Sequence, residues 1–152
     1  MKIAEFLKQK DVEFETHQHA PAYTAQEVAA EEHVSGNMLA KAVVVKGDKG
    51  YAMCVLPASF KLDLEKVGRC LKSGTVRLAD EAELSKLFAD SEVGAEPPFG
   101  NLYNLPTLVD EHLCNCGSIV FQAGTHRDAI KMCYEDYIKL ASPQVCDLAI
   151  HL

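Results

Sequence analysis

The stretch LAKAVVVKGDKGYAMCVLPASFKLDL, from Leu39 to Leu64, holds the longest β-branched run of the chain and predicts the centre of the fold. Residues 42–45 (AVVV) are typical of a strand that is buried on both faces. Residues 47–50 (GDKG) have the composition of a turn, and residues 51–56 (YAMCVL) predict the returning strand. We therefore expect a β-hairpin in the core.

Lys41 stands at the start of the first predicted strand, next to residues that are expected to be inside. An ammonium group at such a place must either meet an anion or reach solvent. Lys41 is therefore either a ligand for an anionic group or a lysine whose methylene groups pack while its amine reaches water. The pattern alone leaves both interpretations open.

Helices and strands alternate on both sides of this hairpin. Before it, we expect a helix over residues 3–10, a strand over residues 12–16, and a helix that begins at the capping box of Thr24 and Glu27 and ends near His33. After it, helices are expected to begin at Asp63 and Asp80, and a last helix is expected over 135–140; strands are expected at 76–78, 108–109, 118–122 and 130–133. The alternation predicts an α/β fold with a mixed sheet.

Length and composition indicate one ordinary globular protein. The 152 residues are enough for a single substantial core, so we expect one domain over residues 1–152. No apolar run approaches the roughly 18 residues of a membrane span. Residues 1–10 (MKIAEFLKQK) predict a short amphipathic helix rather than a signal peptide, and a cytoplasmic protein is expected.

Charge is distributed unevenly along the chain. Residues 39–77 contain eight Lys or Arg and three Asp or Glu, which gives this block a net charge of +5 in a chain of net charge −7. An acidic body with a basic patch fits a local phosphate contact better than sequence-independent wrapping of a duplex. The patch is equally compatible with a solvated surface.

Six cysteines are spread through segments that are expected in the core, and nothing indicates secretion, so we expect reduced thiols. The group closest to a metal motif is His112, Cys114 and Cys116. It lacks the paired spacing of a zinc site, and its residues also have turn composition. We therefore expect no metal site.

Two further segments combine irregular backbone with polar groups. Residues 94–100 (GAEPPFG) place two glycines around two prolines, which fixes a loop whose backbone can approach a ligand closely. Residues 124–126 (GTH) predict a sharp turn, and His126 is a general base, a phosphate or ester ligand, or a surface residue. Tyr23, just before the helix cap, is a hydrophobic staple or a ligand contact. The chain has no nucleophile elbow, Walker loop, dinucleotide fingerprint or HExxH motif.

Taken together, four of these segments resemble the YbaK and prolyl-tRNA-synthetase-associated editing family. They are TAQEVA at 24–29, AKAVVV at 40–45, the G-x-x-x-P-F-G pattern at 94–100 and FQAGTHR at 121–127. The resemblance extends from about Phe14 to Val145. It implies a single-domain α/β fold, with a mixed, barrel-like β-sheet surrounded by helices.

The resemblance also implies an activity and a site. Members of the family hydrolyse the ester of mischarged tRNA in trans, without a metal or a cofactor. By this resemblance the catalytic residues are Lys41, near the terminal nucleotide of the tRNA, and Gly94, Gly124 and His126. The implied substrate-binding residues are Tyr23, Ala95, Pro98, Phe99, Gly100 and Thr125.

The implied substrate is the 3′ end of an aminoacyl-tRNA, and prolyl-tRNA synthetase is a further candidate partner. The form with His126 resembles the branches that act on alanyl or other small aminoacyl groups, so alanine on tRNA for proline is the expected substrate. An aminoacyl ester is already activated, and an aligned water or ribose hydroxyl with backbone N–H donors from a glycine loop suffices to cleave it. Two alternatives are a non-catalytic tRNA- or nucleotide-binding module and a cysteine-centred metal or redox protein.

Overall fold

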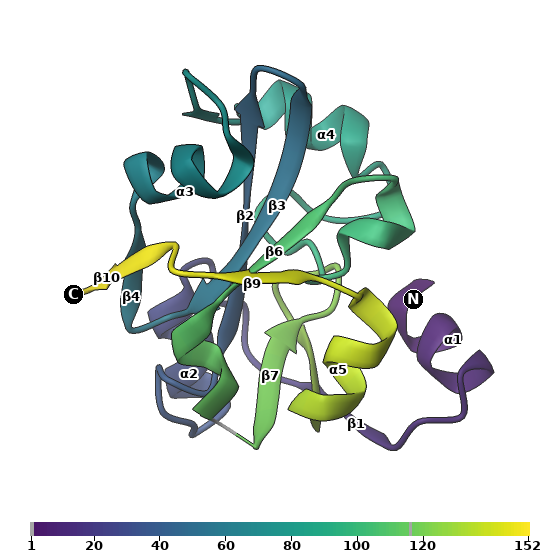
Figure 1. Cartoon of the computed structure of the whole chain (residues 1–152). Helices are drawn as coiled ribbons and strands as arrows, with labels where there is room; N and C mark the ends of the chain where they lie inside the picture. Colours follow the sequence, from purple (N-terminus) through teal and green to yellow (C-terminus); the bar gives the residue numbers. More distant parts are fainter. Residues whose placement is uncertain (1, 116) are drawn as a thin grey trace.

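A computed structural model of the chain describes residues 2–115 and 117–152. These residues form a single-domain mixed α/β fold in which the strands belong to three sheets rather than to one closed barrel (Figure 1). Cys116, part of the weak metal motif, lies outside the described residues. In the part that is described, no helix is long and apolar enough to cross a lipid bilayer.

The largest sheet contains the predicted hairpin at its centre. Strands β2 (Ala40–Gly47) and β3 (Gly50–Pro57) are antiparallel, with Lys41 opposite Leu56 and Gly47 opposite Gly50. The sheet order is β5-β2-β3-β6-β9, and β6 and β9 are parallel to their neighbours. The sheet is therefore mixed, as predicted; its other strands are β5 (Arg77–Leu78), β6 (Thr107–Asp110) and β9 (Gln144–Cys146).

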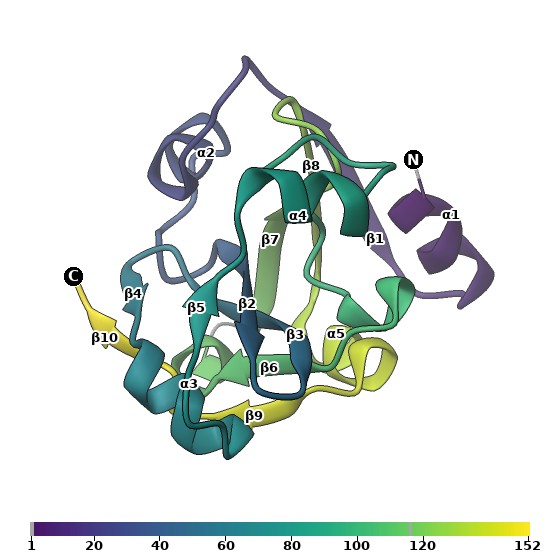
Figure 2. The same cartoon turned by 90° about the horizontal axis from the view of Figure 1, so that it is seen from above.

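A second, antiparallel sheet supports the start of β2. Its strands β1, β8 and β7 run side by side (Figure 2), and a bridge between Leu39 and Val120 joins it to the central sheet. The third sheet pairs β4 with β10 near the C-terminus. The bounds are β1 (Phe14–Gln18), β4 (Phe60–Leu62), β7 (Ser118–Gln122), β8 (Asp128–Cys133) and β10 (Ala149–His151).

The predicted helix caps are present. Thr24 Oγ1 accepts a hydrogen bond from the Glu27 N–H, Asp63 caps the third helix, and Asp80 and Glu83 form a complete capping box. Each such cap stabilises its helix by about 1 kcal/mol. The helices are α1 (Lys2–Gln9), α2 (Ala25–Glu31), α3 (Leu64–Leu71), α4 (Glu81–Leu87) and α5 (Tyr134–Ala141), with 3₁₀ helices η1 (Gly100–Tyr103) and η2 (Glu111–Asn115).

An aromatic cluster in the core holds residues 94–100, called the proline loop, in place. Phe99 makes edge-to-face contacts with Phe6, Phe121 and Tyr137 at centroid distances of 5.9, 5.8 and 5.0 Å. Such pairs contribute about 0.5–1.5 kcal/mol each beyond the area that they bury. The Tyr137 hydroxyl donates to the Pro98 carbonyl at 2.7 Å. The loop is therefore held by the core.

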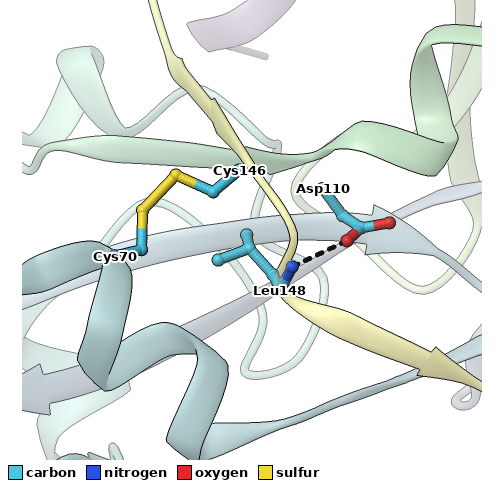
Figure 3. The surroundings of a disulfide bond; sticks show 4 residues. All are labelled: Cys70, Asp110, Cys146 and Leu148. Carbon is cyan, nitrogen blue, oxygen red and sulfur yellow. Dashed lines mark hydrogen bonds between the residues drawn. A yellow bond between two sulfur atoms is a disulfide. The ribbon is translucent and has the colours of Figure 1, made fainter.

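The expectation of reduced thiols is wrong for one pair of cysteines. Cys70 on α3 and Cys146 on β9 form a disulfide (Figure 3). Beside it, the Leu148 N–H donates to the buried Asp110 carboxylate at 2.8 Å. The two cysteines are 76 residues apart, and only the tertiary fold brings them together. Cys54 is a free, buried thiol, and burial raises its pKa to about 12, so it is unreactive.

Candidate active site

A pocket of about 160 Å³ lies at the start of β2. Four segments far apart in the sequence form it: the entry to α2, the beginning of β2, the proline loop and the end of β7. Three residues predicted for the site, Tyr23, Lys41 and Gly94, meet here. The lining residues are Tyr23, Ala25, Leu39, Ala40, Lys41, Ala42, Val43, Gly94, Glu96 and Gln122.

Lys41 brings a positive charge into surroundings that are otherwise mostly apolar. It is half-buried between Ala40 and Ala42, and it forms no ion pair with any residue that the structure describes. Burial lowers the pKa of its amine. A partly desolvated cation without a partner attracts an anionic ligand.

The backbone of β2 is open on the side of the pocket. The neighbouring strand β5 pairs only with Val45 and Lys46, and the Ala79 N–H donates to the Val44 carbonyl at 2.9 Å. Along an antiparallel strand, the N–H and C=O groups of alternate residues point to the same side. The N–H of Ala42 therefore points away from β3, like the groups of Val44, and lies where Ala42 lines the pocket.

Two reciprocal hydrogen bonds connect the proline loop with the turn after β7. The Glu92 N–H donates to the Gly124 carbonyl at 2.7 Å, and the Gly124 N–H donates to the Ala95 carbonyl at 2.8 Å. Gly94 has φ +89° and Gly124 has φ +96°, a region that favours glycine. The Gly94 N–H donates to Glu96 Oε1 at 3.0 Å. Both glycine N–H groups that were expected as donors thus already have acceptors inside the protein.

Glu96 is a buried acid in the wall of the pocket. Only 5% of the residue is exposed. Burial raises the pKa of its carboxyl, while the Gly94 N–H, its own backbone N–H and the nearby His126 act in the opposite direction. It forms no ion pair with any described residue. A carboxylate in such a place is a functional candidate.

Gln122 lies at the end of β7 and also lines the pocket. Its side-chain Oε1 is buried and accepts no hydrogen bond from any described residue. Most buried polar atoms have a partner, so this oxygen in the pocket wall is available to a donor from a water or a ligand.

His126 stands behind Gly94 and beside Tyr23. Its Nε2–H donates to the Val93 carbonyl at 3.0 Å, and its backbone N–H donates to Glu92 Oε1 at 2.7 Å. Nδ1, the other ring nitrogen, is buried and has no hydrogen-bond partner among the described residues. The Tyr23 ring packs against the imidazole with a centroid distance of 4.6 Å. His126 thus supports the rim of the pocket.

This pocket belongs to a known type of domain. The family model described as the aminoacyl-tRNA editing domain matches residues 19–140, a range that includes the whole pocket. The chain belongs to the aminoacyl-tRNA editing domain family. Membership gives it an editing function on aminoacyl-tRNA.

Several solved structures share the fold of this domain. A candidate trans-editing enzyme for prolyl-tRNA synthetase is 25% identical, with a TM-score of 0.83 over 98% of this chain and 95% of its own. Hypothetical protein APE2540 is 22% identical, with a TM-score of 0.89 over 99% and 100% of the two chains. The domain also resembles 31% of a candidate signal transduction protein from Marinobacter aquaeolei VT8, at 16% identity and a TM-score of 0.77.

Several residues that the resemblance assigned to substrate binding lie elsewhere in the editing domain. Phe99 is in the core, and the Gly100 N–H donates to Thr107 Oγ1 at 3.0 Å. Ala95 is fully buried, and the Pro98 carbonyl accepts from Tyr137. These four residues anchor the proline loop to the core and do not line the pocket.

The turn after β7 faces a different hollow. Gly124 and Thr125 line a second pocket of about 230 Å³. Thr125 Oγ1 donates to Asp128 Oδ2 at 2.6 Å and accepts from the Asp128 N–H. The Thr125 hydroxyl therefore closes the turn. Gly124 does not line the first pocket and is connected to it through its backbone hydrogen bonds with Glu92 and Ala95.

Proposed function

We propose that this editing domain is a deacylase that hydrolyses mischarged aminoacyl-tRNA in trans, with alanine on tRNA for proline as the preferred substrate. The observation that carries the proposal is that one small pocket is lined both by Lys41, whose half-buried amine forms no ion pair with a described residue, and by Ala42, whose backbone N–H points away from β3. The likeness to a candidate trans-editing enzyme for prolyl-tRNA synthetase supports the choice of tRNA.

Lys41 holds a phosphate of the terminal nucleotide as a point charge. This contact brings the ester carbonyl to the edge of β2, where the Ala42 N–H donates to the oxygen that becomes negative in the transition state. A water aligned by the neighbouring ribose hydroxyl attacks the carbonyl carbon and gives up a proton. The bond between that carbon and the ribose oxygen breaks, and the ribose oxygen takes up this proton, so the free amino acid and a ribose hydroxyl are released.

The size of the pocket supports selection of a small amino acid. At about 160 Å³, with Leu39, Val43 and Ala25 in its walls, it leaves little room beyond a methyl side chain. A single methylene changes the free energy of binding by only about 1–3 kcal/mol, so a pocket of this kind serves best as a second sieve after a synthetase. Prolyl-tRNA synthetase is the proposed partner that delivers the tRNA.

One observation favours the alternative of a non-catalytic tRNA- or nucleotide-binding module. The N–H groups of Gly94 and Gly124, which a catalytic glycine loop would direct at the oxyanion, are used inside the protein. The module would bind the acylated adenosine without releasing the amino acid.

A panel of mischarged tRNAs separates the two proposals. We expect release of alanine from alanyl-tRNA for proline, and we expect Lys41→Ala to abolish it while the circular dichroism spectrum is unchanged. Lys49→Ala is the matched control, because Lys49 is exposed in the turn of the same hairpin. Equal deacylation by Lys41→Ala would refute the proposed site, and binding without release across the panel would establish the module.

A further inference from the structure

The pocket has more hydrogen-bond acceptors than the protein supplies donors for. Glu96 and Gln122 both line it. The Glu96 carboxylate receives the Gly94 N–H, and Gln122 Oε1 receives no hydrogen bond from any described residue. Burying an unpaired acceptor destabilises a fold. The unpaired Gln122 oxygen therefore lowers the stability of the free protein, and a ligand that donates a hydrogen bond to it would remove this loss.

The acceptors and the cation of the pocket do not neutralise each other. Lys41 and Glu96 form no ion pair, although both line the same small space. Lys41 belongs to β2, the first strand of the hairpin, whereas Glu96 belongs to the proline loop and Gln122 to the end of β7. The complementary ligand therefore carries an anionic group at one end and a cationic donor group at the other.

We propose that Glu96 and Gln122 form a subsite for the free α-ammonium of the aminoacyl group, so that the domain acts on esters with an unmodified amino group and rejects their α-hydroxy or N-acylated counterparts. This inference rests on the proposed function and assigns the part of the substrate that is recognised beyond side-chain size. An aminoacyl ester attached to a terminal nucleotide has the required pair of groups, a phosphate and an ammonium, separated by the sugar and the ester.

The chemistry of the ester gives this subsite a consequence for the rate. A free α-amino group has a pKa of about 7.7–8.0, and a neighbouring carboxylate favours its charged form. A positive nitrogen on the α-carbon withdraws electrons from the carbonyl and makes it more electrophilic. Holding the ammonium also fixes the carbonyl relative to Ala42 N–H. Glu96 and Gln122 are thus positioning residues as well as selectivity residues.

Two stable analogues test the subsite without any turnover. They are derivatives of adenosine 5′-phosphate in which the 3′ oxygen is replaced by an amide nitrogen, one carrying an alanyl group and the other a 2-hydroxypropanoyl group of the same size. We expect the wild-type protein to bind the alanyl analogue at least roughly tenfold more tightly, because a hydrogen bond to a charged group is a strong one. Titration calorimetry measures both affinities.

Variants show which residues produce the preference. Gln122→Met removes the acceptor at similar size, and Glu96→Gln removes the charge but keeps an acceptor for the Gly94 N–H. Both should weaken binding of the alanyl analogue more than binding of the hydroxy analogue, and so bring the ratio of the two affinities toward one. Gln144→Met, an exposed substitution on β9, and Glu81→Gln, an exposed one on α4, serve as controls.

Equal binding of the two analogues by the wild type, no binding of either, or an equal loss for both analogues in the variants would overturn the subsite. If the wild type prefers the alanyl analogue but releases no amino acid from any mischarged tRNA, the subsite stands and the deacylase proposal fails. The two conclusions are therefore tested separately.

Discussion

Cε1 of His126 lies 3.7 Å from the point that a β-carbon on Gly94 would occupy. The two residues come from segments 32 positions apart along the chain, and the contact makes the imidazole the backing of the proline loop. Because 3.7 Å is an ordinary van der Waals distance, space alone does not require glycine at position 94. The left-handed backbone does.

Gly94→Ala should therefore act through backbone strain. At φ +89° a β-carbon costs about 1–2 kcal/mol, and relief of this strain would move the N–H from Glu96 and displace the wall of the pocket. We expect a loss of deacylase activity larger than the loss of stability accounts for. Gly50→Ala is the matched control, because Gly50 has φ +126° and nothing within 4 Å of a β-carbon. Equal activity losses in the two variants would show that the loop position has no special role.

Lys41→Met should stabilise the protein and inactivate it. Because burial lowers the pKa of the Lys41 amine, the folded state binds its proton less readily than the unfolded state does, so at neutral pH the charged amine opposes folding. We expect a higher Tm at pH 7, and a smaller difference from wild type as the pH rises toward the ordinary lysine pKa. Thermal unfolding followed by circular dichroism measures this. A Tm below that of the wild type would mean that the amine has a stabilising partner.

Glu96→Gln should also change stability in a way that depends on pH. The contribution of Glu96 to stability varies with pH in the opposite direction to that of Lys41. Burial raises the pKa of the carboxyl in the folded state, so between the unfolded and folded pKa values the folded protein binds more protons and stability falls as the pH rises. The variant should therefore melt above the wild type at neutral pH, and the difference should shrink near pH 4, where about half of an unfolded glutamate is protonated. A difference in Tm that does not depend on pH would contradict this account.

Reduction of the disulfide should lower stability and leave the pocket intact. A bridge between Cys70 and Cys146, 76 residues apart, restricts the unfolded chain by about 4 kcal/mol in the chain-entropy model. We expect Cys70→Ser and Cys146→Ser to lower the free energy of unfolding equally, and a reductant to have no further effect on either. Neither residue lines the pocket, so affinity for the alanyl analogue should not change.

The free thiol Cys133 provides the control for this experiment. It is exposed and unpaired, so Cys133→Ser should unfold like the wild type. Stability of the wild type that does not respond to a reductant would contradict the role given to the bridge.

Local signals made much of the fold predictable. The β-branched run, the GDKG turn and the side-chain caps at Thr24, Asp63 and Asp80 act within a few residues, and each was confirmed at its place. Strands β4, β9 and β10 were not predicted. Each has three residues and forms only because a partner strand remote in the sequence is in position. The disulfide depends on tertiary contact in the same way.

The residues of the pocket also divide into those that sequence features predict and those that depend on tertiary packing. A lysine at the head of a buried strand and a Gly-Pro loop are visible as sequence features, and they meet. Glu96 and Gln122 were not singled out, because the sequence does not indicate which acids and amides become buried. Phe99 lies within the same motif, yet its side chain points into the aromatic core, and only packing decides that direction.

The half-paired edge of β2 has one more consequence. A strand with free backbone groups invites edge-to-edge pairing with another molecule, and natural proteins discourage such aggregation with charges and with bulk. Here the edge borders a pocket of about 160 Å³ that is lined by Lys41 and is too small for a second polypeptide strand. Under the proposed function a lone ester carbonyl fits this recess where a whole strand does not, so we expect the edge to accept a small ligand and to resist pairing with a second chain.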